Sequence, residues 1–305
     1  ASEITQLSET VTPELTIVMK KDTGSGFVEF HKLNGNTGYS SYSFHQATSL
    51  PTTEIHEKDD FMFGEIDYFF PTVDQLQNSS VRELLYFDQD RKFNPIVFGV
   101  FDGDDRYQTH NFTYHQMPMS PQRRKNGTIL SGKWDYDDFH EIFIIDRDNG
   151  FGQTSLSIQS SYLSIFEIEL LKTTLPIGAL DKDSWDFRVG YYDNDLIPDL
   201  FLLRRFGTGS VEVHILSGSS DYQEWLLHQS LFLHELPNRS MELHIADYNR
   251  DGRSDLYFIN RGVTGSGNTE VHVLDGATNY HNFLLNGVTP LPPLWDHEQF
   301  QFIFD

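Results

Sequence analysis

The sequence contains no cysteine among its 305 residues. Disulfide bonds therefore cannot staple this fold, and thiol chemistry and cysteine-ligated zinc sites are excluded. No apolar run approaches the ~20 residues that a membrane-spanning helix needs, so we expect no membrane insertion. The sequence also lacks a Ser-His-Asp signature, a P-loop and an HExxH motif. These absences remove the most easily recognised classes of enzyme.

Basic residues are scarce. The chain has 22 Lys and Arg against 45 Asp and Glu, which gives a formal net charge of −23 at pH 7. An acidic surface repels nucleic-acid phosphates and anionic lipid, so nucleic acid and membrane surfaces are poor partners and cations are better ones. An alternative is that the acidic residues only keep an extracellular protein soluble.

Several features favour a secretory origin. The first residue is Ala1 instead of Met, and we expect that a signal peptide has been removed. Four Asn-X-Ser/Thr sequons are present, and we expect glycosylation at Asn78, Asn111, Asn126 and Asn238. The sequence thus predicts a secreted, extracellular glycoprotein.

Phe and Tyr are abundant, with 25 and 14 copies, which favours an all-β fold with an aromatic core. The sequence also repeats itself five times. The units span residues 61–118, 131–176, 187–237 and 242–292, and a split unit combines residues 14–51 with 300–305.

Each unit has four short apolar runs separated by turn residues, which is the pattern of a four-stranded propeller blade. The split unit lacks its first strand at the N-terminus and finds it at the C-terminus. We therefore predict one β-propeller domain over residues 1–305, with five blades closed by pairing of the two ends. A β-sandwich is the alternative fold.

Two short sequence signatures support this alignment of the five units. A glycine is followed four residues later by tyrosine in four units: Gly35/Tyr39, Gly103/Tyr107, Gly218/Tyr222 and Gly276/Tyr280. An acidic residue opens the second strand in all five: Glu14, Glu83, Glu141, Asp199 and Asp255.

One loop has the oxygen spacing of a calcium site. Asp247, Asn249, Asp251 and Asp255 stand at positions 1, 3, 5 and 9, and the carbonyl of Arg253 at position 7 would add a ligand. Alternate spacing turns every second side chain inward, and calcium takes six to eight oxygen ligands. The loop is not an EF-hand, because its twelfth residue is a phenylalanine.

The motif weakens towards the N-terminus. The preceding unit keeps Asp193, Asp195 and Asp199, with the Ile197 carbonyl at position 7; the one before keeps Asp135, Asp137 and Glu141. In this third loop Lys133 stands at position 1, where its ammonium could replace the metal. The alternative for all these loops is an acidic turn whose Asp side chains cap backbone amides.

The D-x-N-x-D-G-x-x-D loop, followed by an aliphatic and aromatic strand, resembles the FG-GAP/VCBS repeat. That repeat builds the integrin α-subunit propeller and several secreted lectins and adhesins. The resemblance covers nearly the whole chain and implies bound Ca²⁺, although propellers of this family usually have about seven blades.

Histidines also recur at repeat positions. His31, His214 and His272 occupy one position, and His45, His115 and His228 end fourth strands. Such repetition suggests small repeated sites, as in multivalent lectins, but gene duplication alone gives the same pattern.

Taken together, these observations predict a calcium-binding extracellular module that recognises a glycan or glycoprotein. One alternative is a structural subunit of a larger extracellular assembly. Another is a five-bladed glycoside hydrolase, since every first strand carries an acid: Asp67, Asp135, Asp193, Asp247 and Asp305. The calcium loops already account for most of these acids.

Overall fold

The computed structural model describes residues 12–55, 59–64, 83–88, 96–101, 106–108, 110–115, 127–135, 139–160, 168–236, 240–262, 264–296 and 299–304. Strands and short 3₁₀ turns make up the regular structure of these residues, with no α-helix among them. No helix in this part of the chain could therefore cross a membrane.

The described strands form four-stranded antiparallel sheets. One contains, in order, β20 (Phe300–Phe304), β1 (Leu15–Met19), β2 (Phe27–Leu33) and β3 (Tyr42–Pro51). The next contains β4 (Asp60–Gly64), β5 (Glu83–Asp88), β6 (Ile96–Phe101) and β7 (His110–His115). A third contains β8 (Gly127–Gly132), β9 (Glu141–Asp146), β10 (Gln153–Gln159) and β11 (Glu169–Gly178).

Two more sheets follow along the chain. One contains β12 (Trp185–Gly190), β13 (Asp199–Arg204), β14 (Ser210–Leu216) and β15 (Trp225–His234). The other contains β16 (Met241–Ala246), β17 (Asp255–Asn260), β18 (Glu270–Leu274) and β19 (Phe283–Val288).

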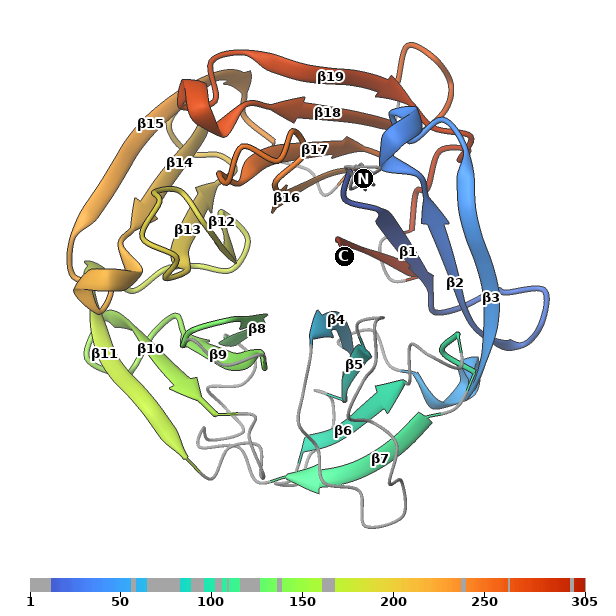
Figure 1. Ribbon diagram of the computed structural model, residues 1–305, viewed down its shortest axis with the longest axis horizontal. Helices are drawn as coiled ribbons and strands as arrows, with labels where there is room; N and C mark the ends of the chain where they lie inside the picture. The colour runs from blue at the N-terminus through green and yellow to red at the C-terminus, as the bar shows by residue number, and fades with distance from the viewer. Residues whose placement is uncertain are drawn as a thin grey trace, which may run out of the picture.

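The sheets stand around a central axis in a propeller-like arrangement (Figure 1). The first strand of each sheet is innermost, and contacts between these inner strands run from β20 to β4, β8, β12, β16 and back to β20. Strand β20 pairs antiparallel with β1, from Leu15 opposite Phe304 to Met19 opposite Phe300. The two ends of the chain thus belong to one sheet, as the split repeat predicts.

The strand bounds differ from the repeat bounds at several places, and the first strand of the third repeat shows the clearest difference. Strand β8 begins at Gly127 and pairs with β9 along its whole length, so it starts before residue 131, where the third repeat was predicted to begin. The repeat was aligned on the acidic loop that follows the strand. The strand itself is Gly127–Gly132, which carries little apolar signal and precedes that loop.

The core lies between adjacent sheets. The second strand of a sheet is buried on both faces, as in β9, where every residue is buried, because a neighbouring sheet covers each face. Aromatic side chains fill much of the space: Phe30 lies edge-on to Phe61, Phe101 and Tyr107, with ring centroids 5.6–6.2 Å apart. These contacts join β2 of one sheet to β4 and β6 of the neighbouring sheet.

The acid that opens the second strand holds a corner of the sheet together. Asp255 is fully buried; its Oδ2 accepts a hydrogen bond from the Tyr248 amide and its Oδ1 one from the Gly276 amide, both at 2.8 Å. The Tyr280 hydroxyl donates to the Ser254 carbonyl oxygen at 3.1 Å. A Cβ on Gly276 would lie 2.5 Å from that oxygen, so only glycine fits.

The same corner recurs in other sheets. The Asp199 Oδ1 accepts from the Gly218 amide at 3.0 Å, and the Tyr222 hydroxyl donates to the Pro198 carbonyl at 2.9 Å. Tyr39 donates to the Pro13 carbonyl in the sheet formed by the two ends. The acid and the Gly–Tyr pair of the sequence are therefore parts of one structural device.

Candidate functional site

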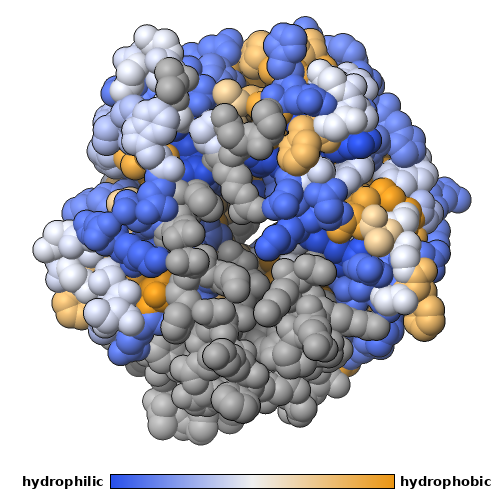
Figure 2. Space-filling model, turned by 180° about the vertical axis from the view of Figure 1, so that it is seen from behind, coloured by the Kyte–Doolittle hydropathy of each residue, from blue (hydrophilic) through white to orange (hydrophobic). Residues whose placement is uncertain are grey.

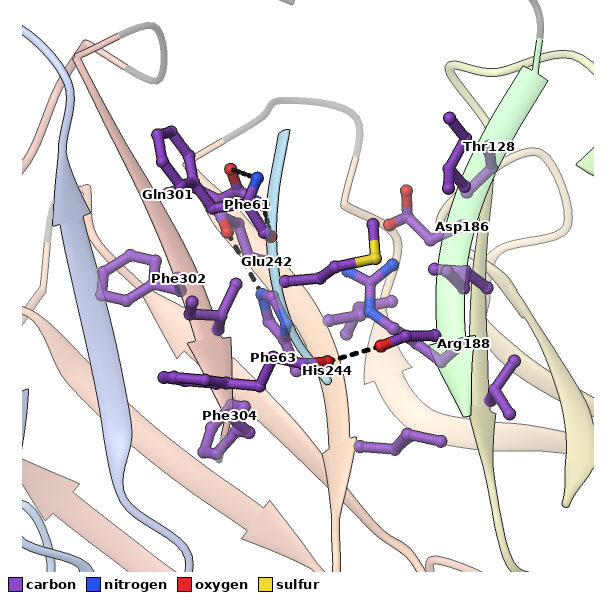
Figure 3. Close-up of a pocket in the computed structure, with 18 of the residues that line it drawn as sticks. Phe61, Phe63, Thr128, Asp186, Arg188, Glu242, His244, Gln301, Phe302 and Phe304 are labelled. Carbon is purple, nitrogen blue, oxygen red and sulfur yellow. Dashed lines mark hydrogen bonds and ion pairs between the residues drawn. The ribbon is translucent and has the colours of Figure 1, made fainter. Parts of the chain in front are cut away.

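The innermost strands enclose a central cavity of about 460 Å³. Figure 3 shows two of its walls: Glu242 and His244 come from β16, and Asp186 and Arg188 come from β12. Figure 2 shows the molecule from the side opposite to Figure 1, with a hollow near the centre and a mostly hydrophilic surface over the described residues.

Ion pairs organise the charges around this cavity. The Asp186 Oδ2 lies 3.0 Å from the Arg205 Nη1. The Glu242 carboxylate lies 3.0 Å from the Arg261 Nε and 3.2 Å from the His244 Nε2. Both acids therefore face cations.

These partners control the protonation of both acids. Burial raises the pKa of Asp186, but Arg188 and Arg205 outweigh it and hold that pKa below its ordinary value. Burial likewise raises the pKa of Glu242, but His244 and Arg261 lower it. Neither group thus has the raised pKa that a general acid of a glycoside hydrolase needs.

A buried basic residue follows the second strand in four sheets, at an equivalent position: Lys20, Arg147, Arg205 and Arg261. Each side chain reaches the next sheet around the axis, Lys20 over the Phe61 ring and Arg261 over the Phe300 ring. Arg147 donates to the Trp185 carbonyl at 2.9 Å, and Arg205 to the Met241 carbonyl at 2.7 Å. The four residues therefore tie neighbouring sheets together near the axis. The repetition of these basic residues is visible in the sequence, but their contacts with the next sheet are visible only in the structure.

The predicted calcium loop is closed by its own hydrogen bonds. The Asp247 carboxylate accepts from the amides of Asp251 at 3.2 Å and Gly252 at 2.9 Å. Asn249 accepts from the Asp251 amide at 3.1 Å, and Asp251 from the Arg253 amide at 2.9 Å. These bonds are the amide caps that the alternative interpretation describes.

Burial raises the pKa of Asp247, and the charge of Asp251 raises it further. Burial also raises the pKa of Asp255 to about 7, with Asp247 and Asp251 adding to the effect. The loop thus concentrates negative charge that a bound cation would stabilise.

The other predicted loops follow the same pattern in part. Asp193 accepts from the Asp195 amide at 3.1 Å, and Asp195 from the Ile197 amide at 2.9 Å. Burial raises the pKa of Asp199 to about 6. Glu141 accepts from the Trp134 amide at 2.7 Å.

Most of the remaining predicted site residues lie outside the described residues. Asp135 is exposed, whereas Asp67, Asp137 and Asp305 lie outside the described residues, as do the sequon residues Asn78, Asn126 and Asn238. Asn111 lies in β7, opposite Val100. In the described ranges, no three or more His, Asp or Glu side chains come together as a preformed metal site.

The structure brings together residues that the sequence left separate. On the outer two strands of three sheets, an aromatic ring, a histidine, a glutamate and a histidine or asparagine form what we call a rim cluster. The first cluster is Tyr42, His31, Glu29 and His45; the second is Trp225, His214, Glu212 and His228; the third is Phe283, His272, Glu270 and Asn286.

Register explains why these clusters form. His31 stands directly opposite His45, His214 opposite His228, and His272 opposite Asn286. In each sheet one further pair follows in register and then the register shifts; such bulges re-aim nearby side chains. Two members of each repeated set of histidines thus form a cross-strand pair, His31 with His45 and His214 with His228. His272 instead faces Asn286, and His115 faces Ile96.

Short contacts order the imidazoles. The Nδ1 atoms of His31 and His45 are 2.7 Å apart, and those of His214 and His228 are 2.8 Å apart. Burial and His45 lower the pKa of His31. Burial also lowers the pKa of His214, with His228 and Arg204 adding to it. Both rings are therefore neutral at neutral pH.

No family model matches the chain, and no curated protein is similar to it at a significant level. What the chain does must therefore be argued from its own geometry.

Proposed function

We propose that this protein is a secreted binding module that recognises glycans or glycoproteins outside the cell through the rim clusters. In this proposal the chain is a closed, five-bladed propeller of the FG-GAP/VCBS type. The five described four-stranded sheets and the pairing of β20 with β1 support the blade count.

The observation that carries the proposal is the repetition of the rim clusters. Tyr42, Trp225 and Phe283 stand at equivalent register positions beside an imidazole and a carboxylate. Tyr42 is 46% exposed and Phe283 41%. A flat aromatic face beside hydrogen-bonding groups suits the apolar face and hydroxyls of a sugar ring.

Three equivalent clusters on one molecule favour a repetitive ligand. Linked binding events raise the overall affinity by 10²–10⁴-fold when the sites can be engaged together. The outer strands β3, β15 and β19 belong to different sheets on the circumference of the molecule (Figure 1). A branched or polymeric glycan therefore fits better than a single monosaccharide.

The experiment is a glycan array followed by titration calorimetry with the strongest ligand. We expect selective binding by the monomer, with loss of at least tenfold in affinity in the Tyr42→Ala, Trp225→Ala, Phe283→Ala triple variant. Phe151→Ala is the matched control, because Phe151 is 87% exposed but lies outside the clusters. This variant should bind like the wild type.

Other outcomes point to different functions. Absence of any sugar binding together with a defined oligomer would favour a structural subunit; the exposed rings of Phe232 and Phe283, 5.4 Å apart in neighbouring sheets, suit such a contact. Equal binding by the triple variant would move the glycan site away from the rim.

Calcium at the Asp247–Asp255 loop is part of this proposal. A ligand that binds only the folded state stabilises it by about 2.7 kcal/mol at a hundredfold excess over its Kd. Melting with calcium and with a chelator should therefore differ in the wild type and differ much less in Asp251→Ala. An unchanged midpoint in the wild type would count against calcium.

A further inference from the structure

We propose that the two cross-strand histidine pairs, His31/His45 and His214/His228, each bind one divalent copper ion. This site is separate from the acidic loops, and nothing in it depends on the glycan proposal. Two imidazole nitrogens would ligate the metal, and water would fill its remaining positions on the solvent side.

The geometry of the pairs supports a shared ion. Both pairs join a third and a fourth strand at directly opposed positions. The Nδ1–Nδ1 separations are 2.7 and 2.8 Å. The same arrangement in two sheets is a property of the repeat, and His45 and His228 are exposed, so an ion can reach them from solvent.

The glutamates prepare the ligand nitrogens. The Glu29 Oε2 lies 3.4 Å from the His31 Nε2, and the Glu212 Oε2 lies 3.1 Å from the His214 Nε2. A carboxylate that accepts a hydrogen bond from the Nε2–H group leaves Nδ1 unprotonated and raises its basicity. Such a carboxylate is the usual hydrogen-bond partner of a metal-bound histidine. The free nitrogen points at the opposing imidazole.

The spacing favours copper over zinc. With metal–nitrogen bonds of about 2.0 Å, adjacent ligands of a square-planar ion lie roughly 2.8 Å apart, and tetrahedral ligands roughly 3.3 Å apart. The observed separations, at which a hydrogen bond joins the two rings, also match the square-planar case that Cu²⁺ prefers. A bound ion would therefore replace that hydrogen bond, with both Nδ1 atoms unprotonated. Affinity for nitrogen ligands also peaks at Cu²⁺ in the divalent series, whereas Ca²⁺ selects oxygen.

The third rim cluster supplies a natural control. There His272 Nδ1 faces Asn286 Oδ1 at 2.8 Å, with Glu270 3.4 Å from the His272 Nε2. The strand register and the hydrogen bond are kept, but one imidazole is replaced by an amide. This cluster should bind copper much more weakly.

The experiment is a titration of the whole chain with CuCl₂, followed by native mass spectrometry and electron paramagnetic resonance. His45→Asn and His228→Asn each copy the third cluster, so the fold should remain. We expect each variant to lose one bound Cu²⁺ relative to the wild type, and Asn286→His to gain one. The resonance spectrum should show nitrogen coupling that weakens in both loss variants.

A second readout tests the role of the glutamates. Glu212→Gln should weaken copper binding at its pair by 10–100-fold, the usual effect of losing such a partner, with no change at His31/His45. If His45→Asn or His228→Asn still binds as many Cu²⁺ ions as the wild type, the histidine pair changed in that variant is not a copper site. Equal copper stoichiometry and affinity in the His45→Asn, His228→Asn double variant would overturn the proposal.

Discussion

The inner and outer ends of the sheets use polar residues in opposite ways. Near the axis, Arg205 and Arg261 are buried, and each pairs with an acid of its own sheet. Each also reaches the next sheet, Arg205 at the Met241 carbonyl and Arg261 over the Phe300 ring. At the rim, His45 and His228 are exposed, and each faces a histidine of its own sheet. Polar groups at the axis join sheets to one another, whereas those at the rim leave hydrogen-bonding capacity for solvent or a ligand. Substitutions should therefore affect stability at the axis and binding at the rim.

Removal of the C-terminal strand should give the largest effect. Truncation after residue 298 deletes β20, which exposes the edge of β1 and the apolar surface that Phe300 and Phe302 bury. We expect an insoluble chain or a strongly lowered melting temperature, measured by scanning calorimetry. A truncated chain that remains folded and monomeric would contradict closure by β20.

Arg261→Met should give the next largest effect. Arg261 is 2% exposed and pairs with Glu242 at 3.0 Å, and removal of one partner of a buried ion pair costs about 3 kcal/mol or more. Chemical denaturation measures the loss. Lys172→Met is the control, because Lys172 and Glu169 form an exposed pair that should contribute less than about 1 kcal/mol. Equal losses would remove the distinction between axis and surface.

Tyr280→Phe tests the corner that the sequence signature marks. The substitution leaves the buried Ser254 carbonyl without its hydroxyl donor, which costs about 1–2 kcal/mol. Tyr42→Phe, at an exposed tyrosine, should change the free energy of unfolding by less than about 0.5 kcal/mol. An unchanged free energy of unfolding in Tyr280→Phe would show that the hydroxyl has no structural role.

Acid should weaken the ion pairs near the axis. The pKa values of Asp186 and Glu242 lie below their ordinary 3.8 and 4.5 in the folded protein. Their stabilisation is therefore present above those ordinary values and is lost as the pH falls through the lowered pKa values. Melting temperatures should drop below about pH 4.5, with a smaller drop in Arg261→Met. If the melting temperature of Arg261→Met fell with acid as much as that of the wild type, the result would contradict the Arg261–Glu242 ion pair.

The repeat was predictable because local chemistry marks it. The acid at the start of the second strand and the Gly–Tyr spacing satisfy backbone groups within one sheet. The acid therefore leaves a signal in all five units and the Gly–Tyr spacing in four. Asp255, Gly276 and Tyr280 are an example, since all three contact the same corner. Sequence spacing was enough to group the strands into sheets, including β20 beside β1, although it placed the start of β8 too late.

The rim clusters and the contacts of the buried basic residues with the next sheet were not predicted, because they depend on how strands and sheets are placed against one another. His31 and His45 are 14 residues apart, and only the cross-strand pairing puts them in contact. Arg205 reaches the Met241 carbonyl in the next sheet. The acidic loops were recognised, but their oxygens bond to amides in the described structure, and spacing alone could not decide between amide caps and metal ligands.

The central claim is that the rim binds and the axis holds the sheets together. The most direct measurement is the affinity for the best array glycan, by titration calorimetry, in the rim triple variant and in Arg261→Met, each with its melting temperature. We predict that the triple variant loses binding at an unchanged melting temperature, and that Arg261→Met loses stability but binds normally at a temperature where it is folded. A rim variant that binds normally, or an axis variant that is stable but cannot bind, would contradict the claim.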